Sequence, residues 1–291
     1  MTQIIQSLSE VSDRYTALFV DLWGCVHNGI QAFPEAVAAL RAFRATGGKV
    51  VLVTNSPKPR AGVATQLGSF NVPEDCYDVI ATSGDSARSA MYRGAVGNKV
   101  YFMGEWTRDA GFFEPLNVIE NPVEIERVPL REAEGIVCCG PFDPLADPDV
   151  NRADFLYAKQ KGMKLLCANP DIIVDRGEVR EWCAGALARL YTEMGGESLY
   201  FGKPHPPIYD LARRRLASLG VEVDMGRILA IGDGPHTDIQ GAMGEDIDSL
   251  FISGGLAAVE TKTSHQPDPE ALNAYIQKEM ISPTYSIGLL R

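Results

Sequence analysis

The sequence lacks the features of membrane, secreted and nucleic-acid-binding proteins. No apolar stretch approaches the ~18 residues of a membrane span, and residues 1–6 contain no basic segment followed by an apolar run. Basic residues are outnumbered, 27 against 38 acidic ones, and the net charge of −11 repels nucleic-acid phosphates and anionic lipids. We therefore expect a soluble cytoplasmic protein with no nucleic-acid or membrane partner.

Cysteine is present but lacks the spacing of a zinc site or of a disulfide framework. The six cysteines are Cys25, Cys76, Cys138, Cys139, Cys167 and Cys183, and no two of them form a C-x-x-C pair. Several lie in apolar runs, where a free cysteine behaves as a small hydrophobic residue. We expect six buried thiols and neither disulfides nor zinc ligands.

The composition gives no sign of disorder. Hydrophobic residues make up 45% of the chain and charged residues 22%, as in ordinary globular proteins. At 291 residues, the chain is longer than a typical domain of roughly 100–200 residues. Two domains are therefore expected.

Short apolar runs alternate with stretches of helical spacing, a pattern typical of a parallel sheet flanked by helices. Four of these runs are followed by a polar residue, either directly or after one glycine. They are residues 18–20, 50–53, 199–201 and 228–231, which precede Asp21, Thr54, Lys203 and Asp233. Because ligands of open α/β sheets bind beyond the carboxyl ends of the strands, we expect the four polar clusters to converge at one sheet edge.

The spacing of the four runs indicates an inserted domain. The interval between Thr54 and Lys203 is several times longer than the other two intervals, and it contains apolar runs of its own. These runs are residues 100–102, 136–138 and 165–167, with a helical pattern around residues 153–158. We predict a Rossmann-like α/β core formed by residues 1–85 and 198–291, an inserted α/β cap formed by residues 86–197, and a loosely ordered tail from Ser282.

Three aspartates in two segments of the chain suit metal-dependent phosphate chemistry. A carboxylate at Asp21 can attack phosphorus and form an aspartyl-phosphate, although a residue that caps the next turn is the simpler interpretation of this aspartate alone. Asp233 and Asp238 lie around a glycine-containing turn, and Mg²⁺ prefers octahedral oxygen ligation by one or two carboxylates. An aspartate-rich helix start is the alternative interpretation of that segment.

Hydrogen-bond donors follow the other two runs. Thr54, Asn55 and Ser56 supply hydroxyl, amide and backbone N–H groups, which a transferring phosphoryl group requires. Lys203 could neutralise charge on the equatorial phosphoryl oxygens, although a single lysine is usually a surface residue. The combination of the four segments indicates a phosphate site more strongly than any one of them.

In order and spacing, the four segments resemble the signature motifs of the haloacid dehalogenase superfamily. They are Asp21-x-x-Gly24, Val53-Thr54-Asn55, Gly202-Lys203-Pro204 and Gly232-Asp233-x-x-x-Thr237-Asp238. The third motif and the long interval before it resemble the class IIA branch, whose sugar-phosphatase and nitrophenylphosphatase-like enzymes carry a large α/β cap. Ala168-Asn169-Pro170-Asp171 also resembles a cap segment of that branch.

The resemblance implies a Mg²⁺-dependent phosphatase acting on a small phosphorylated metabolite, such as a sugar phosphate. It implies that Asp21 is the nucleophile and that Lys203 stabilises charge. The implied metal ligands are Asp21, the backbone carbonyl of Trp23, Asp233 and Asp238. We expect substrate and phosphate binding by Thr54, Asn55, Ser56, Asn169 and Asp171. The resemblance also suggests a homodimer formed through the cap.

Trp23 departs from the family pattern. Phosphatases of this family usually carry a second aspartate two positions after the nucleophile, where it protonates the leaving oxygen and later activates water. An indole N–H can serve neither purpose, and positioned proton transfer typically contributes ~10²–10⁴-fold to the rate. We therefore expect slow hydrolysis of alkyl phosphate esters and less impairment on acyl phosphates or aryl esters.

Three interpretations fit this departure. Another group could supply the proton, and the candidates near the motifs are His27, His205, His236 and Cys25. The reaction could need no acid, as in family members that act on activated or carbon–phosphorus substrates. The chain could also be a weak or inactive phosphate- and metal-binding protein that serves as a sensor or partner subunit. Retention of both Asp233 and Asp238 argues against a metal-free dehalogenase.

Overall fold

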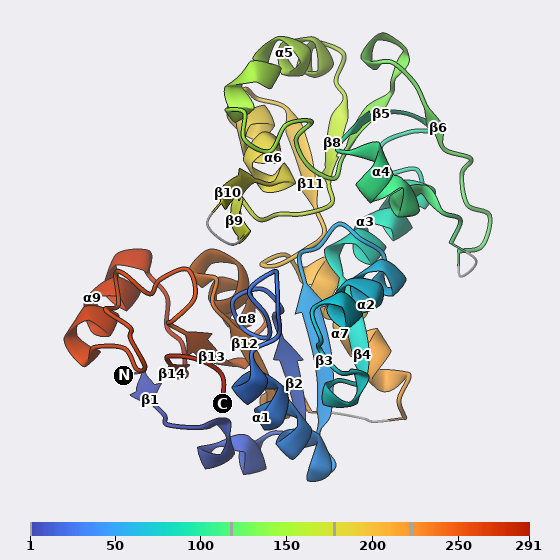
Figure 1. Cartoon of the computed structure of the whole chain (residues 1–291). Coiled ribbons are helices and arrows are strands. Elements are labelled where there is room, and N and C mark those ends of the chain that lie inside the picture. The colour runs from blue at the N-terminus through green and yellow to red at the C-terminus, as the bar shows by residue number, and fades with distance from the viewer. Residues whose placement is uncertain (1, 117–118, 177–178, 221–223) are drawn as a thin grey trace. The chain divides into compact units, whose positions relative to one another are not determined.

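The computed structural model describes residues 2–116, 119–176, 179–220 and 224–291. The chain divides into two compact units (Figure 1). The first unit comprises Met1–Thr54, Ala64–Ala81 and Tyr209–Arg291, and the second comprises Asn55–Val63 and Thr82–Ile208. All of residues 86–197 belong to the second unit, and the predicted limits of core and cap stay a prediction.

A sheet of seven strands, counted over the described residues, runs through the first unit. In order across the sheet the strands are β1 (Gln3–Ile4), β14 (Tyr285–Ile287), β13 (Asp248–Ile252), β12 (Ile228–Gly232), β2 (Ala17–Val20), β3 (Lys49–Thr54) and β4 (Val79–Thr82). The strands from β1 to β3 all pair in parallel. The central strands β12 and β2 are buried at every residue, as expected of parallel strands that are covered on both faces.

Helices accompany this sheet, and the first of them begins at a proline. Pro34 starts α1, because its fixed φ suits the first helical position, and Ala36, Val37, Leu40 and Phe43 form its buried face. The helices are α1 (Pro34–Ala45), α2 (Arg60–Ser69), α7 (Pro206–Ala217), a π-helix (Pro235–Ile239), α8 (Gln240–Gly244) and α9 (Pro269–Glu279). Short 3₁₀ turns lie at Leu8–Glu10, Ser12–Arg14, Glu74–Cys76 and Met225–Arg227.

The second unit contains a parallel sheet of its own. Its strands, in order, are β11 (Glu197–Tyr200), β8 (Lys164–Cys167), β7 (Gly135–Cys138), β5 (Lys99–Met103) and β6 (Glu126–Arg127), and an antiparallel pair is formed by β9 (Ile173–Arg176) and β10 (Val179–Trp182). The helices are α3 (Ser83–Tyr92), α4 (Trp106–Asp109), α5 (Arg152–Gln160) and α6 (Ala184–Glu193), with 3₁₀ turns at Ala110–Phe113, Leu130–Glu132 and Pro148–Asn151.

The predicted α/β fold with parallel sheets is confirmed, and so are the three strands predicted within the insertion, which are β5, β7 and β8. All six cysteines are buried thiols, as expected. Among the described residues, none of the helices combines the length and the apolar character that crossing a membrane requires.

Two expectations about strands are wrong. The run at residues 199–201 was expected in the same sheet as Asp21, but β11 pairs with β8 in the second sheet. The stretch from Ser282 is no loose tail, because β14 lies between β1 and β13 and its three residues are buried. The two chain ends therefore lie at the same edge of the first sheet, where the Leu8 N–H donates to the Arg291 carbonyl at 2.7 Å (Figure 1).

Candidate active site

Two aspartates follow neighbouring strands of the first unit. Asp21 comes directly after β2 and Asp233 directly after β12, and these strands pair in parallel with Val20 opposite Ile231. The Asp21 N–H donates to the Ile231 carbonyl at 2.8 Å. Because carboxyl ends of parallel strands share one sheet edge, the pairing brings both carboxylates together. Both side chains are buried, with residue exposures of 8% and 6%.

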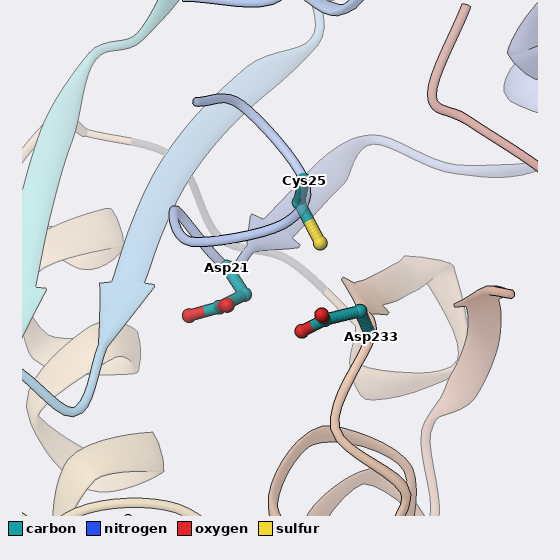
Figure 2. Close-up of side chains that lie close together, drawn as sticks. All are labelled: Asp21, Cys25 and Asp233. Atoms are coloured by element: carbon teal, nitrogen blue, oxygen red, sulfur yellow. The ribbon is translucent and has the colours of Figure 1, made fainter. Parts of the chain in front are cut away.

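Figure 2 shows Asp21 and Asp233 close to Cys25. One carboxylate oxygen from each aspartate and the Cys25 Sγ all lie within 4.8 Å of one another. Carboxylates this close repel each other unless a cation or a proton compensates. Mg²⁺ takes oxygen ligands, commonly one or two carboxylates, whereas a thiol is a soft ligand that suits other metals. The donor chemistry of the two aspartates therefore fits Mg²⁺, and that of Cys25 does not.

Thr54 belongs to the same sheet edge. It is the last residue of β3, which pairs with β2 on the side opposite β12. Its side chain is buried, with 7% of the residue exposed. The structure thus brings residues of three predicted motifs, Asp21, Thr54 and Asp233, to the carboxyl ends of three adjacent strands of one sheet.

The loop after Asp21 is built around the indole of Trp23. A Cβ atom at Gly29 would lie 2.4 Å from Cζ2 of Trp23, so the indole rests directly on the α-carbon of that glycine. The His27 ring meets the indole edge-on, with ring centroids 5.3 Å apart, and the Gly24 N–H donates to the His27 carbonyl at 2.9 Å. Trp23 is therefore an integral part of the loop.

The structure describes the surroundings of the histidines proposed as substitute acids. His27 is buried, its Nδ1 accepts the Gly29 N–H at 3.0 Å, and burial lowers its pKa to about 4. His27 is thus neutral near pH 7 and has no proton on Nδ1 to donate. His236 is exposed, and its Nε2 lies 2.9 Å from Oε2 of Glu279 on α9.

His205 and Cys25 complete the set of alternative donors. In the second unit, His205 stacks on Tyr200 with ring centroids 4.7 Å apart, and burial lowers its pKa. Cys25 is the alternative that lies in the cluster with Asp21 and Asp233. A proton donor that replaces the missing aspartate stays a prediction.

Asp238 supports the turn that carries Asp233. Its Oδ2 accepts the Gly234 N–H at 3.1 Å and the Thr237 hydroxyl at 3.3 Å. The turn continues into the π-helix Pro235–Ile239, a rare element that is frequent at functional sites. Asp238 does not belong to the group of ligand atoms around Asp21, and direct metal ligation by Asp238 stays a prediction.

The structure joins Asn55, Lys203 and Asp171 in the second unit. The Asn55 Oδ1 accepts the Lys203 N–H at 2.7 Å, and its Nδ2 donates to the Lys203 carbonyl at 3.1 Å and to the Asp171 Oδ1 at 2.8 Å. An amide group has two donor hydrogens, and both are used here. The Asn55 side chain therefore holds Lys203 and Asp171 in place, and phosphate binding by Asn55 stays a prediction.

The remaining predicted residues of the second unit shape their own loops. The Asn169 Oδ1 accepts the Asp171 N–H at 3.0 Å, so Asn169 orders the Asn-Pro-Asp turn. Ser56 is half-buried, and its Oγ accepts the Lys58 N–H at 3.3 Å. Substrate contacts of Asn169, Asp171 and Ser56 stay predictions.

The loop that follows β13 contributes to the site and was not predicted from the sequence. The backbone N–H of Leu256 donates to the Asp233 Oδ2 at 3.0 Å, and Gly255 packs against the same carboxylate. A backbone donor carries no signal of residue type. The available signal is the pair Gly254-Gly255, one residue after a buried strand, where a backbone can approach another group closely.

Comparison with known proteins places the chain in one family. The family model described as haloacid dehalogenase-like hydrolase matches residues 18–112, and a second, HAD-hydrolase-like model matches residues 200–275. The chain is 26% identical to the 5'-nucleotidase YutF of Bacillus subtilis, over 95% of this chain and 96% of the relative. It is 22% identical to the acid sugar phosphatase of Staphylococcus aureus, over 94% of each chain.

A solved structure resembles the chain more strongly. The haloacid dehalogenase-like hydrolase of Brucella suis shares 38% sequence identity with this chain and superposes with a TM-score of 0.85. The match covers 99% of this chain and 100% of the Brucella suis chain. Identity at this level over the whole of both chains, together with the motif residues at the strand ends, establishes that the chain belongs to the haloacid dehalogenase superfamily of hydrolases.

Proposed function

We propose that the chain is a Mg²⁺-dependent phosphatase that hydrolyses a small phosphorylated metabolite through an aspartyl-phosphate on Asp21. The observation that carries the proposal is the buried pair of carboxylates, Asp21 and Asp233, at the ends of adjacent parallel strands. The names of the two curated relatives, a 5'-nucleotidase and a sugar phosphatase, support phosphate esters as the substrate class. A sugar phosphate is one candidate within that class.

The chemistry starts from the carboxylate of Asp21. One of its oxygens attacks phosphorus, the bond to the leaving-group oxygen breaks, and the phosphoryl group is held as an acyl phosphate. Water then attacks phosphorus, the bond between phosphorus and the Asp21 oxygen breaks, and inorganic phosphate leaves while the proton lost by water passes to solvent, which restores the carboxylate. Asp21, the Trp23 carbonyl, Asp233 and Asp238 are the proposed metal ligands, and bound Mg²⁺ would neutralise charge on the phosphoryl oxygens.

The other predicted residues have proposed roles in binding. Thr54 contributes its hydroxyl to phosphate binding, and Lys203 neutralises charge on the phosphoryl group. The Asn55 side chain is proposed to orient the Lys203 backbone, since both of its amide hydrogens are used there and at Asp171. A class IIA cap formed by residues 86–197 is proposed to select the substrate and to form a homodimer contact.

The leaving group departs without help from the residue at position 23. The indole of Trp23 is packed on Gly29 and donates no labile proton, and His27 is neutral. We therefore propose that turnover of alkyl phosphates is slow and that esters with good leaving groups react faster. This ordering follows because a weakly basic leaving oxygen needs no proton in the transition state.

The test is Mg²⁺-dependent phosphate release from acetyl phosphate, an aryl phosphate and a sugar phosphate by wild type and Asp21→Asn. Release that requires Asp21 and is fastest on the activated compounds supports the proposal. Equal rates on the sugar phosphate would indicate a replacement acid. Absence of Asp21-dependent release from all three compounds would overturn the phosphatase assignment and favour a binding role.

A further inference from the structure

The carboxylate of Asp233 is enclosed by backbone on two sides. A Cβ atom at Gly24, in the loop after β2, would lie 2.3 Å from the Asp233 Oδ2, and one at Gly255, in the loop after β13, would lie 2.1 Å from it. Real Cβ atoms essentially never come this close to another atom. Neither position can therefore carry a side chain while Asp233 keeps its place.

The two glycines differ in what their backbones require. Gly24 has φ +75°, a conformation that favours glycine whatever its surroundings. Gly255 is not among the residues with positive φ, so its φ does not by itself call for glycine. The three atoms nearest to its missing Cβ all belong to Asp233. Contact with the carboxylate is therefore the structural reason for glycine at position 255.

The next residue completes the enclosure. The Leu256 N–H donates to the Asp233 Oδ2 at 3.0 Å, while the α-carbon of Gly255 packs against the Asp233 Cβ and Cγ. A carboxylate is planar, so holding Oδ2 and the side-chain carbons also fixes the direction of Oδ1. Charge-assisted hydrogen bonds from backbone N–H groups are stronger than neutral ones and resist reorientation.

We propose that Gly255 and Leu256 are positioning residues that fix the Asp233 carboxylate for Mg²⁺, an inference that rests on the proposed metal-dependent function. Mg²⁺ demands near-ideal octahedral geometry, so a small rotation of one ligand weakens binding. Partners that orient metal ligands typically contribute about 10–100-fold to metal affinity. Gly255→Ala is expected to raise the Kd for Mg²⁺ by about tenfold or more, because the new methyl group pushes the carboxylate aside.

Two glycine variants in the same unit serve as controls. A Cβ atom at Gly254 would lie 2.5 Å from the Gly288 carbonyl oxygen, and none of the three atoms nearest to it belongs to Asp233, so Gly254→Ala should lower stability without changing Mg²⁺ affinity. A Cβ atom at Gly244, the last residue of α8, meets no atom within 4 Å. Gly244→Ala should leave Mg²⁺ affinity unchanged and should not lower stability, because alanine is the better helix former.

The experiment is calorimetric titration of Mg²⁺ into the full chain, for wild type, the three alanine variants and Asp233→Asn. Weakened binding in Gly255→Ala, with wild-type affinity in Gly254→Ala and Gly244→Ala, supports the proposal. Wild-type affinity in Gly255→Ala overturns it. Equal weak binding by wild type and Asp233→Asn would overturn the metal site itself, a result that differs from failure of the positioning role.

A second variant keeps the test decisive if Gly255→Ala does not fold. Leu256→Pro removes the N–H that donates to Oδ2 and adds no atom at position 255. It is expected to weaken Mg²⁺ binding and to raise the Mg²⁺ concentration needed for half-maximal phosphate release. Unchanged Mg²⁺ affinity in Leu256→Pro would overturn the proposal.

Discussion

The side chain of Asn55 bonds to both backbone groups of Lys203, which lies far away in the sequence. Its Oδ1 accepts the Lys203 N–H at 2.7 Å and its Nδ2 donates to the Lys203 carbonyl at 3.1 Å. The Asn55 amide thus pairs with the Lys203 backbone through one donated and one accepted hydrogen bond, as a backbone residue pairs with its neighbour in a β-sheet. The proposed phosphate loop and the proposed charge-neutralising lysine are thereby held as one element, with residue exposures of 2% and 3%.

Asn55→Ala is expected to destabilise the chain and slow turnover together. The substitution removes a partner from the buried backbone of Lys203 and from Asp171, and each buried polar group left unsatisfied costs ~1–3 kcal/mol. Displacement of a charge-stabilising group can reduce kcat on the order of 10²-fold. Urea unfolding and phosphate release measure the two effects.

Asn151→Ala is the matched control for Asn55→Ala. The Asn151 Nδ2 donates to the Pro148 carbonyl at 3.0 Å in a half-buried turn of the same unit. Loss of one such bond costs about 0.5–1.5 kcal/mol and should leave kcat unchanged. If both variants lose the same stability and keep full activity, the Asn55–Lys203 pair has no special role.

Trp23→Asp is expected to change which substrates are hydrolysed best. It places a carboxyl group at the position where the family resemblance implies a general acid, so the rate on a sugar phosphate should rise relative to an aryl phosphate, by up to ~10²–10⁴-fold. Stability should fall because the packing on Gly29 and His27 is lost, by less than the ~3–5 kcal/mol typical of a fully buried tryptophan. The measurement is the ratio of kcat/KM for the two esters.

Trp23→Phe is the control for Trp23→Asp, because it removes the indole without adding a carboxyl group. It therefore distinguishes the effect of a new acid from the effect of losing the indole. Phenylalanine keeps an aromatic ring against Gly29 and supplies no proton, so the substrate ratio should stay at the wild-type value. A ratio that rises equally in both variants would show that the bulk of the indole, and not the missing acid, limits hydrolysis of alkyl esters.

The buried cysteines should be inert in the folded protein. Burial raises the pKa of Cys76 to about 11 and that of Cys138 to about 12, and the thiolate is the reactive form. Labelling with iodoacetamide at pH 8 should therefore require unfolding. Rapid modification of Cys138 in the native protein, detected by mass spectrometry, would contradict this account.

The same shifts make stability depend on pH on the alkaline side. The unfolded chain releases its thiol protons from about pH 8.5, whereas the folded chain keeps those of Cys76 up to about pH 11. The raised folded pKa therefore contributes stability that is complete below pH 8.5 and is lost as the pH rises. Urea midpoints should fall between pH 8 and pH 10, and the fall should be smaller in Cys76→Ala.

The C-terminal strand is expected to be essential for folding. Ile287 in β14 is fully buried, and truncation of a buried isoleucine to alanine typically costs ~2–5 kcal/mol. Val259→Ala is the control, because Val259 is 86% exposed and surface changes usually stay within about 0.5 kcal/mol. Equal unfolding midpoints for Ile287→Ala and Val259→Ala would contradict the placement of β14 inside the sheet.

Much of the fold could be predicted from the sequence, because buried parallel strands produce short apolar runs that end at polar residues. The runs before Asp21, Thr54 and Asp233 are strands β2, β3 and β12 of one sheet. The run at residues 199–201 could not be assigned to the correct sheet, since an apolar run carries no information about its partner strand. The three-residue strand β14 was missed because it is too short to show a period.

The candidate site was predictable where chemistry depends on side chains and was not where it depends on the backbone. Asp21 and Asp233 were identified because carboxylates stand at strand ends. The hydrogen bond from the Leu256 N–H to Asp233 could not be predicted, because every residue except proline has a backbone N–H. The use of both Asn55 amide hydrogens could not be predicted either, because it depends on tertiary contacts. Sequence patterns show which groups are available, and only packing shows how they are used.

The most direct test of the proposed mechanism is detection of the phosphorylated enzyme. Wild type mixed with an aryl phosphate and Mg²⁺, quenched in acid within milliseconds and digested, should yield the peptide that contains Asp21 with the added mass of one phosphoryl group. The modification should be absent in Asp21→Asn and when Mg²⁺ is removed by a chelator. Steady release of phosphate with no trapped phosphoryl group, or with equal release by Asp21→Asn, would contradict nucleophilic attack by Asp21.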